Sequence, residues 1–332
     1  MVIQQSYKKV LIIRLSSIGD ILLTTPIIRC IKQQWSASIH FLTLRRFVSL
    51  LEYNPYIDSL LLYEKGIIPR LRSEEYDLVI DLHRNAKSFI IKSLIQRPVI
   101  TYRKHNIEKW LLVRFNMHCI PAGHVIDRYF QALDKTGIQN DGRGLDFFVD
   151  PRIEKKSKIL LPSGPYYVLV LGGTYFTKRI SLNKAMEIIS KIDLPVVLLG
   201  GSDVKKTGDF ISEKFPDKAR SLAGIISIHS SAALIKHSRF VVTGDTGLMH
   251  LASAFQKKIF VLWGNTVPAF GLGPYITIRE KNIVTNIESQ LSCRPCSKLG
   301  HQECPKRHFL CMESLDISSI VNFAKTIHSL SS

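Results

Sequence analysis

The stretch Lys9-Val-Leu-Ile-Ile-Arg-Leu-Ser-Ser-Ile-Gly-Asp20 contains a short apolar run, a turn of small residues and the start of a helix. It predicts a buried strand over Val10–Arg14 and a helix beginning about Gly19–Asp20. Asp20 is therefore expected at a strand-to-helix junction that opens on a ligand cleft. Helix capping, worth about 1 kcal/mol, is the alternative role of this carboxylate. Pro26 is expected to bend the helix that follows, because it lacks an amide donor.

The same alternation of short β-branched runs and longer amphipathic stretches continues along the chain and favours parallel sheets with crossover helices. The predicted strands are Val10–Arg14, Ile39–Leu44, Ser59–Tyr63, Leu78–Asp81, Val99–Tyr102, Tyr166–Leu171, Val196–Gly200, Phe240–Thr243 and Ile259–Trp263. The helical segments between them include Leu182–Ser190, Lys205–Phe215 and Gly247–Phe255.

The chain is expected to form two domains. Residues 150–165 are charged and then rich in Pro, Gly and Ser, which is typical of a linker. We therefore predict one doubly wound α/β domain over residues 1–155 and a second over residues 156–332. A cleft between the carboxyl ends of their strands would hold the ligands.

The net charge is +18, with +7 in residues 1–150 and +11 in residues 151–332. Such a field favours polyanionic partners: nucleic acid, anionic lipid or a phosphorylated substrate; general solubility is the alternative. Nucleic-acid binding is disfavoured, because no element interleaves basic and aromatic residues. No run reaches the about 18 apolar residues of a spanning helix, so a cytoplasmic protein with reduced cysteines is expected.

The loop Leu171–Arg179 follows a predicted strand and has the composition of a diphosphate site. Its glycine pair, which includes Gly173, permits close approach of a ligand to the backbone. Thr174 and Thr177 offer hydroxyls, and Lys178 offers positive charge beside a helix N-terminus. An ordinary βα turn with a solvated basic pair is the alternative.

A second phosphate site is predicted in Phe240–His250, where a strand ends and Gly-Asp-Thr-Gly turns the chain into a helix. Capping by Asp245 and Thr246 is the alternative. His250 would lie one helical turn further on, directed at the same ligand. The amides that would hold a phosphate oxygen belong to Thr246, Gly247 and Leu248.

Together these segments resemble glycosyltransferase family 9, the ADP-heptose:lipopolysaccharide heptosyltransferases. The resemblance extends from about Lys9 to Met312. Two positions depart from the family pattern: Ile180-Ser181 after the loop lysine, and Gly244 before Asp-Thr-Gly. The matching motifs are Ser17–Pro26, Asp81–Asn85, His124–Tyr129, Lys178, Asp245–His250, Gly264–Thr266 and Gly273-Pro274.

The resemblance implies a GT-B fold and an inverting transferase without a metal or cofactor. Asp20 would be the general base, and Lys178 would neutralise the departing diphosphate. Asp203 would bind the donor ribose, with a surface turn carboxylate as the alternative. The donor site would comprise Gly173, Thr174, Thr177, Asp203, Asp245, Thr246, Gly247, Leu248 and His250.

The acceptor implied by the family is the lipopolysaccharide inner core, with peripheral contact at the inner membrane left open. A related transferase with another nucleotide sugar or glycan acceptor is the main alternative. His124, Asp127 and Arg128 are assigned either to this side or to a structural salt bridge. The predicted acceptor-binding residues are Ser17, Gly19, His83, Arg84, Asn85 and Arg103.

Four cysteines lie close together near the C-terminus. Four thiolates within about 20 residues can hold structural zinc tetrahedrally, although this spacing is not that of a standard zinc finger. Buried thiols without a metal are the alternative, and no catalytic metal is assigned. The cluster consists of Cys293, Cys296, Cys304 and Cys311.

Overall fold

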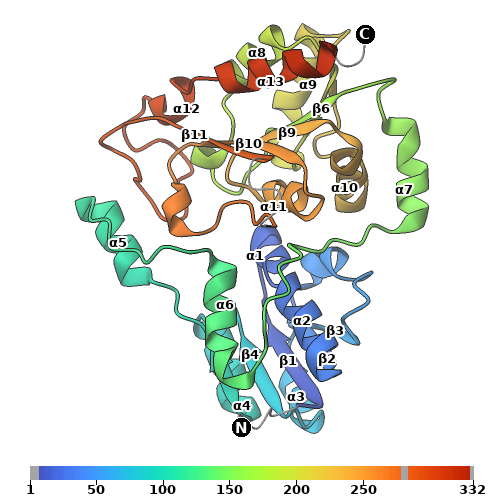
Figure 1. The fold of residues 1–332 in the computed structure, drawn as a ribbon, viewed down its shortest axis with the longest axis vertical. Coiled ribbons are helices and arrows are strands. Elements are labelled where there is room, and N and C mark those ends of the chain that lie inside the picture. Colours follow the sequence, from blue (N-terminus) through green and yellow to red (C-terminus); the bar gives the residue numbers. More distant parts are fainter. Residues whose placement is uncertain (1–6, 278–282, 330–332) are drawn as a thin grey trace. The chain divides into compact units, whose positions relative to one another are not determined.

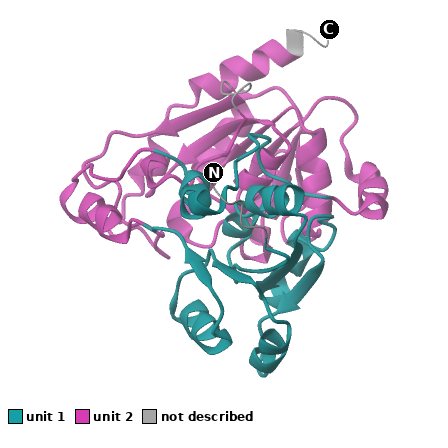
Figure 2. Ribbon diagram, turned by 60° about the horizontal axis from the view of Figure 1, so that its bottom comes forward, with its two compact units in different colours: residues 1–104, 123–148 teal, residues 105–122, 149–332 magenta. Residues whose placement is uncertain are grey.

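The computed structural model describes residues 7–277 and 283–329 (Figure 1). It divides into two compact units (Figure 2). Unit 1 comprises Met1–Lys104 and Gly123–Phe148, and unit 2 comprises His105–Ala122 and Val149–Ser332. The division thus falls a few residues before the expected boundary at residue 155, and the short segment His105–Ala122 groups with unit 2.

Unit 1 is built on a five-stranded parallel sheet with the order β3-β2-β1-β4-β5. Successive strands add outwards from β1 first on one side and then on the other, so right-handed crossovers place helices on both faces. The strands are β1 (Lys9–Ile13), β2 (Ser38–Thr43), β3 (Ser59–Leu62), β4 (Leu78–Asp81) and β5 (Val99–Thr101).

The helices of unit 1 begin at sites that the sequence marks. Pro26 lies in the first turn of α2, where its missing amide costs nothing, so it starts a helix instead of bending one as expected. The elements are α1 (Ile18–Leu22), α2 (Thr25–Trp35), η1 (Arg45–Leu50), α3 (Ile67–Ser73), α4 (Ala86–Ile95), α6 (Val125–Leu133) and η2 (Asp134–Thr136).

Unit 2 contains a six-stranded parallel sheet with the order β11-β10-β9-β6-β7-β8. In both sheets the strand order reverses at one point, between β1 and β4 in unit 1 and between β6 and β9 in unit 2. The strands are β6 (Tyr167–Val170), β7 (Val196–Leu199), β8 (Ala219–Ser221), β9 (Phe240–Thr243), β10 (Lys258–Trp263) and β11 (Val284–Glu288).

The helical elements of unit 2 include those predicted after β6, β7 and β9. They are α5 (Asn106–Phe115), α7 (Pro151–Ser157), η3 (Lys158–Leu160), η4 (Phe176–Lys178), α8 (Leu182–Lys191), η5 (Ser202–Val204), α9 (Lys205–Lys214), α10 (Ile228–His237), α11 (Gly247–Ala254), η6 (Pro268–Phe270), α12 (Leu310–Glu313) and α13 (Ser318–Ser329).

The segment predicted as a linker, residues 150–165, is in large part helical. Asp150 caps α7 by accepting from the amide of Arg152 at 2.8 Å, and a proline occupies the first turn. Lys236 on α10 binds Glu154 on α7 at 2.6 Å. The segment that follows the division between the two units therefore contains a helix, which the Asp-Pro pair starts.

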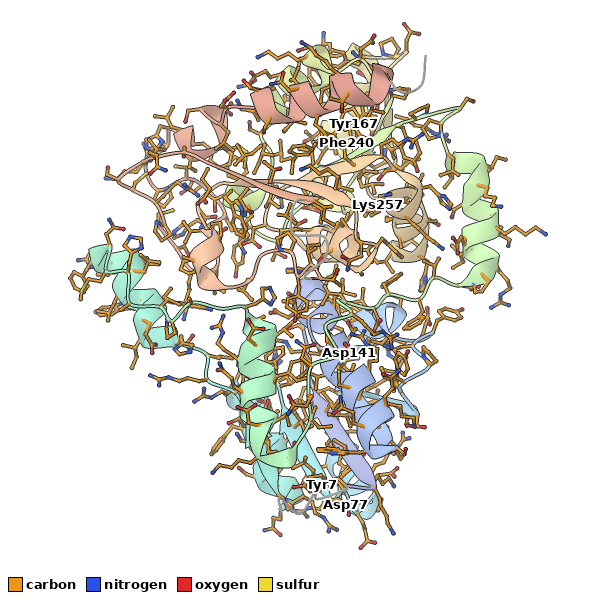
Figure 3. The ribbon with its side chains drawn as sticks, in the orientation of Figure 1. Tyr7, Asp77, Asp141, Tyr167, Phe240 and Lys257 are labelled. Atoms are coloured by element: carbon orange, nitrogen blue, oxygen red, sulfur yellow. The ribbon has the colours of Figure 1, made fainter. Side chains whose placement is uncertain are left out.

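The core of unit 2 centres on aromatic side chains of its middle strands. The rings of Tyr167 on β6 and Phe240 on β9 stack with centroids 4.9 Å apart and planes 3° apart (Figure 3). Phe260 on β10 meets Phe240 edge-on at 5.8 Å. These buried rings hold the strands on both sides of the point where the sheet order reverses, and this fixes the loops that leave β6 and β9.

Candidate active site

The candidate site of unit 1 lies at the carboxyl ends of β1, β4 and β5. These three strands are neighbours, and parallel strands end at the same edge of a sheet. Arg14 follows β1, His83 follows β4, and Lys104 comes shortly after β5. Asp20 lies in the first turn of α1. The ligand side of a doubly wound sheet is this edge, at the point of strand-order reversal.

Asp20 is held by three donors. Its carboxylate accepts from the hydroxyl of Ser17 at 2.9 Å and from the Ser17 amide at 3.3 Å. Nη2 of Arg14 lies 2.6 Å from Oδ1 of Asp20. The N-cap of α1 is Ser17, and Asp20 completes a capping box by accepting from the Ser17 amide, so the capping role offered as the alternative is present together with the ion pair. These contacts hold the carboxylate in one orientation.

Arg14 is a site residue that sequence reasoning missed. Its Nε donates to the carbonyl of Ser16 at 2.8 Å, and its Nη1 donates to the carbonyl of Leu82. The side chain is 7% exposed, whereas that of Asp20 is 31% exposed. The buried guanidinium therefore joins the loops after β1 and β4 and supports the more exposed carboxylate. The sequence signal that could have identified Arg14 is a basic residue at the end of a buried, apolar strand.

Arg14 also controls the protonation of Asp20. Burial by itself would raise the pKa of Asp20, but the ion pair with Arg14 and the hydrogen bonds from Arg14 and Ser17 outweigh it and lower the pKa to about 2. Asp20 therefore remains a carboxylate at neutral pH.

This pairing predicts how the rate depends on pH. A carboxyl with a pKa of about 2 stays charged as pH falls, so kcat/KM should not decline through Asp20 above about pH 4. Arg14→Gln removes the cation, and burial should then raise the pKa above the ordinary value of about 3.9. An acidic decline is expected between about pH 4 and 6 in pH–rate profiles of this variant. Identical pH–rate profiles for the wild-type protein and Arg14→Gln would contradict this account. Arg45→Gln is the control, because the Arg45 side chain is 78% exposed and its loss should leave the profile unchanged.

His83 lies in the same positive environment. Burial and then the cations of Arg14 and Lys104 lower the pKa of His83 to about 4, so its ring is neutral near pH 7. Nε2 of His83 lies 2.8 Å from Nδ2 of Asn85. Because that amide nitrogen donates, Nδ1 carries the ring proton. Among the described residues this buried Nδ1 has no hydrogen-bond partner.

The motif Asp81–Asn85 builds the loop that presents His83. The buried carboxylate of Asp81 accepts from the amides of His83 and Arg84 at 3.0 and 2.7 Å and from the hydroxyl of Ser88 at 2.9 Å. Oδ1 of Asn85 caps α4 by accepting from the amide of Ser88 at 3.0 Å. Asp81 and Asn85 therefore act first as structural residues.

The remaining residues predicted on this side have different surroundings. Arg84 has a left-handed backbone conformation, with φ of 48°, and its Nη1 donates to the carbonyl of Tyr102 at 2.7 Å. Gly19 is buried within α1, and Arg103 is exposed.

Burial, and then the cation of Arg14, lowers the pKa of Lys104 to about 8. Lys104, like Arg14, was missed.

His124 and Asp127 stabilise the start of α6. Oδ2 of Asp127 accepts from the amide of His124 at 2.7 Å, and Nδ1 of His124 accepts from the amide of Ile126 at 3.2 Å. These contacts are helix capping, and the salt bridge between helices offered as the alternative for His124, Asp127 and Arg128 stays a prediction.

The candidate site of unit 2 lies where the loops after β6 and β9 meet. Nζ of Lys178 lies 2.7 Å from Oδ2 of Asp245, and the hydroxyl of Thr266 donates to the same oxygen at 2.9 Å. The two charged side chains are 17% and 11% exposed. A Cβ on Gly244 would lie 2.2 Å from the carbonyl oxygen of Lys178. The departure from the family pattern at Gly244 thus allows close contact between the two loops.

The start of α11 adds partial positive charge beside this pair. Thr246 is the N-cap residue, but its side chain makes no capping hydrogen bond, and its Oγ1 lies 3.1 Å from that of Thr243. The capping alternative for Asp245 and Thr246 is therefore not observed. The first amides of a helix have no acceptor within it, so those from Thr246 to Leu248 suit an anion. His250 is buried one turn further along.

The loop after β6 contains both exposed and engaged side chains. Thr174 is exposed, whereas the hydroxyl of buried Thr177 accepts from the amide of His301 at 2.9 Å. Arg179 donates to the carbonyl of Gly173 at 2.9 Å and binds Asp203 at 2.7 Å. Thr177 thus joins two loops, and Asp203 binds Arg179, the second cation of the predicted diphosphate loop.

The cysteine-rich segment supports the same loops. Arg294, whose side chain is 6% exposed, donates through Nε to the carbonyl of Gly264 at 2.6 Å and through Nη2 to that of Thr266 at 2.9 Å. Together with the Thr177–His301 contact, this connects the segment to both sides of the Lys178–Asp245 pair. Neither Arg294 nor His301 was predicted, because only the fold places them here.

Replacing Arg294 with Met is expected to lower the free energy of unfolding by about 1–3 kcal/mol, because the carbonyls of Gly264, Thr266 and Ser289 lose a charged donor. Binding of ADP, the nucleotide that the family resemblance predicts, should weaken in parallel, since the Gly264–Thr266 loop loses its support. Denaturant unfolding and calorimetric titration would measure the two effects. Arg45→Met, at an exposed position in unit 1, should change neither. Unchanged stability and affinity would contradict this assignment.

The four clustered cysteines are free thiols, and Cys311 is buried. Burial raises the pKa of Cys311 to about 12 and also raises that of Cys296. Within residues 7–277 and 283–329, no three His, Cys, Asp or Glu side chains are arranged to hold a metal ion.

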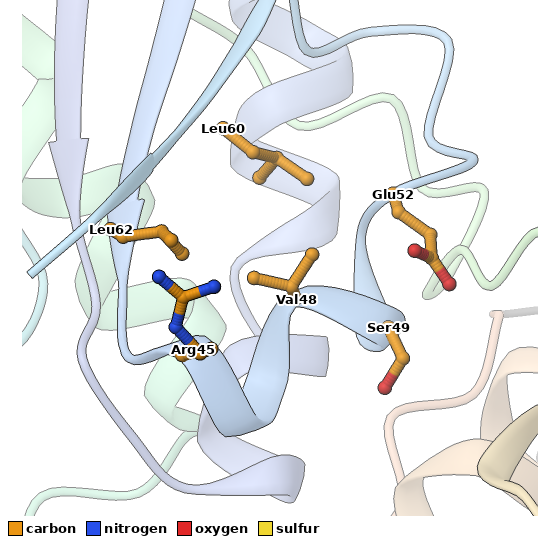
Figure 4. Close-up of a pocket in the computed structure, with 6 residues that line it drawn as sticks. All are labelled: Arg45, Val48, Ser49, Glu52, Leu60 and Leu62. Atoms are coloured by element: carbon orange, nitrogen blue, oxygen red, sulfur yellow. The ribbon is translucent and has the colours of Figure 1, made fainter.

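A separate surface hollow lies on unit 1 between η1 and β3 (Figure 4). None of the predicted site residues lines it. Its lining is formed by Arg45, Val48, Ser49, Glu52, Leu60 and Leu62. It therefore lies apart from the carboxyl ends of β1, β4 and β5.

Two doubly wound parallel sheets in two units are the architecture of the GT-B class of glycosyltransferases. The chain belongs to glycosyltransferase family 9 (heptosyltransferase), whose model matches residues 66–305. It is therefore a glycosyltransferase of the heptosyltransferase family of lipopolysaccharide biosynthesis. No helix among the described residues is long and apolar enough to span a bilayer.

Similar proteins agree with this assignment. Lipopolysaccharide heptosyltransferase 3 of Escherichia coli K12 is 25% identical over 287 residues, covering 76% of this chain and 81% of that protein. The family 9 glycosyltransferase of Veillonella parvula aligns with a TM-score of 0.72 at 20% identity, covering 87% and 88% of the two chains. ADP-heptose lipopolysaccharide heptosyltransferase II of Escherichia coli aligns with a TM-score of 0.67 at 19% identity, covering 92% and 98%. The GT-B prediction is confirmed.

Proposed function

We propose that the protein is an inverting, metal-independent transferase that moves heptose from ADP-heptose to the lipopolysaccharide inner core. The observation that carries the proposal is the Lys178–Asp245 pair beside the start of α11, since a cation and free amides together suit a departing diphosphate. A structural relative is named for ADP-heptose, which favours this donor.

In the proposed reaction an acceptor hydroxyl attacks the anomeric carbon of the donor sugar. The new C–O bond forms as the bond to the diphosphate breaks, and ADP leaves with the electron pair. Asp20 takes the hydroxyl proton, and attack from the opposite face inverts the anomeric configuration. Lys178 and the amides of Thr246, Gly247 and Leu248 stabilise the charge on ADP. These groups would take the part that a divalent ion plays in other transferases.

Acceptor recognition is assigned to the carboxyl ends of β1, β4 and β5. Neutral His83, in the loop after β4, would contact the acceptor there. The cations near Asp20 suit the phosphate groups of an inner core. Because the acceptor is lipid-anchored and the donor is a nucleotide sugar, the enzyme would work at the cytoplasmic side of the inner membrane.

The test is release of ADP from a panel of nucleotide sugars with a truncated lipopolysaccharide acceptor. ADP-heptose should give turnover, EDTA should leave the rate unchanged, and NMR of the product should show the inverted linkage. Turnover only with another nucleotide sugar would favour the related transferase instead. Retention of configuration, or loss of activity in EDTA that added Mg²⁺ restores, would contradict the mechanism.

A further inference from the structure

Helix α5 (Asn106–Phe115; Figure 1) carries an apolar surface that unit 2 leaves exposed. Six of its ten residues are apolar, yet only Leu112 is buried. Ile107 is 72% exposed, Trp110 54% and Phe115 57%, and Met117 just beyond the helix is 51% exposed. Single exposed apolar side chains are ordinary, but four within eleven residues form a patch that marks an interaction site.

The exposed apolar side chains of α5 itself, Ile107, Trp110 and Phe115, form one continuous patch. Residues three and four apart lie on the same side of a helix, which places Ile107, Trp110 and Arg114 together. The rings of Trp110 and Phe115 meet with centroids 5.4 Å apart. On the opposite side, Nζ of Lys109 lies 5.9 Å from the ring centroid of Phe270 in η6. The helix therefore packs on unit 2 with one face and presents the other.

The charge of residues 103–118 indicates which kind of partner this surface would bind. Residues 103–118 contain four cations, Arg103, Lys104, Lys109 and Arg114, and a single acid, Glu108. Oε1 of Glu108 lies 3.0 Å from Nδ1 of His105, so this acid is engaged at the base of the helix. The exposed face thus combines Trp and Phe with Arg114, while Glu108, two turns before Phe115, is only 17% exposed and is engaged with His105. Aromatic side chains with flanking Lys and Arg suit the boundary between lipid headgroups and acyl chains.

We propose that the α5 face, defined as Ile107, Trp110, Arg114, Phe115 and Met117, docks on a bilayer that contains anionic lipid. The inference rests on the proposed function in that it names the surface that meets the membrane carrying the acceptor. Apolar side chains insert at the interface, and Arg114 binds headgroup phosphates. A short interfacial helix of this kind adsorbs reversibly and does not span the bilayer.

Tryptophan fluorescence is a direct readout. The chain has three tryptophans, and Trp35 and Trp263 are 6% and 1% exposed. Trp110 therefore supplies the exposed indole. Full-length protein mixed with phosphatidylcholine vesicles containing phosphatidylglycerol should show a blue-shifted emission, quenching by brominated lipid, and co-flotation that weakens with salt. Vesicles of phosphatidylcholine alone should bind much less.

The variant Trp110→Ser/Phe115→Ser should bind anionic vesicles at least about tenfold more weakly, because two large apolar side chains are lost. Its melting temperature and its turnover on a delipidated acceptor should stay unchanged, so this result is separable from failure of the proposed transfer reaction. Phe210→Ser is the matched control, since Phe210 is 41% exposed on α9 with Nζ of Lys214 5.6 Å from its ring.

Three outcomes would overturn the proposal. The first is equal flotation of the wild-type protein and the double variant. The second is wild-type binding that is indifferent to anionic lipid. The third is a concentration-dependent dimer that the double variant abolishes while vesicle binding survives, which would assign the face to a second copy of the chain.

Discussion

Replacing Asp20 with Asn is expected to lower kcat by about 10²–10⁴-fold while binding of ADP persists. The proposed base accepts the proton of the acceptor hydroxyl, and an amide of the same shape cannot do so. Asp20 lies in unit 1, whereas the predicted donor groups lie in unit 2, so donor affinity should be unaffected. ADP-release kinetics and calorimetric titration would separate the two effects.

The same substitution leaves the buried guanidinium of Arg14 without its charged partner, so stability must be measured alongside the rate. Asp20→Glu keeps the charge, and its loss of rate should be smaller, reflecting displacement of the carboxylate. Asp58→Asn removes a carboxylate that binds Lys32 at 2.8 Å elsewhere in unit 1, and it should retain full turnover. Full activity in a folded Asp20→Asn protein would remove Asp20 from the mechanism.

Replacing Lys178 with Ala should lower kcat by about 10²–10³-fold and also weaken ADP binding. The cation is proposed to stabilise the diphosphate, and its loss would leave the carboxylate of Asp245 unpaired beside an anion. Asp245→Asn alone measures the effect of removing the Asp245 charge. The double variant Lys178→Ala/Asp245→Asn completes a double-mutant cycle. If the pair acts as a unit, the double variant should lose less than the sum of the two single losses.

Lys205→Ala is the matched control for Lys178. Lys205 also binds a carboxylate, that of Asp209 at 2.6 Å, but its side chain is 48% exposed and lies on α9. It should change neither kcat nor ADP affinity. A Lys178→Ala protein with wild-type turnover would instead make the ion pair a structural contact between the loops after β6 and β9.

The sequence located most of the strands because their composition reports burial. A parallel strand covered on both faces is a continuous apolar run, and β4 and β9 begin and end where predicted. The two missed strands, β8 and β11, lie at the edges of the second sheet. Both strands contain polar residues, because an edge strand has only one neighbouring strand and other elements cover it less completely. Their short sequences therefore cannot be distinguished from those of loops.

The motifs also indicated the two charged positions on which the proposed chemistry depends. A strand followed by small residues and a helix places Asp20 and Lys178 near the carboxyl ends of β1 and β6. What surrounds those charges came only from the tertiary structure. Arg14 faces Asp20 only once the chain has turned into α1, and the backbone of His301 reaches Thr177 across 124 positions in the sequence. Local patterns encode turns and burial, whereas the electrostatic partners of a site are set by long-range packing that no short motif records.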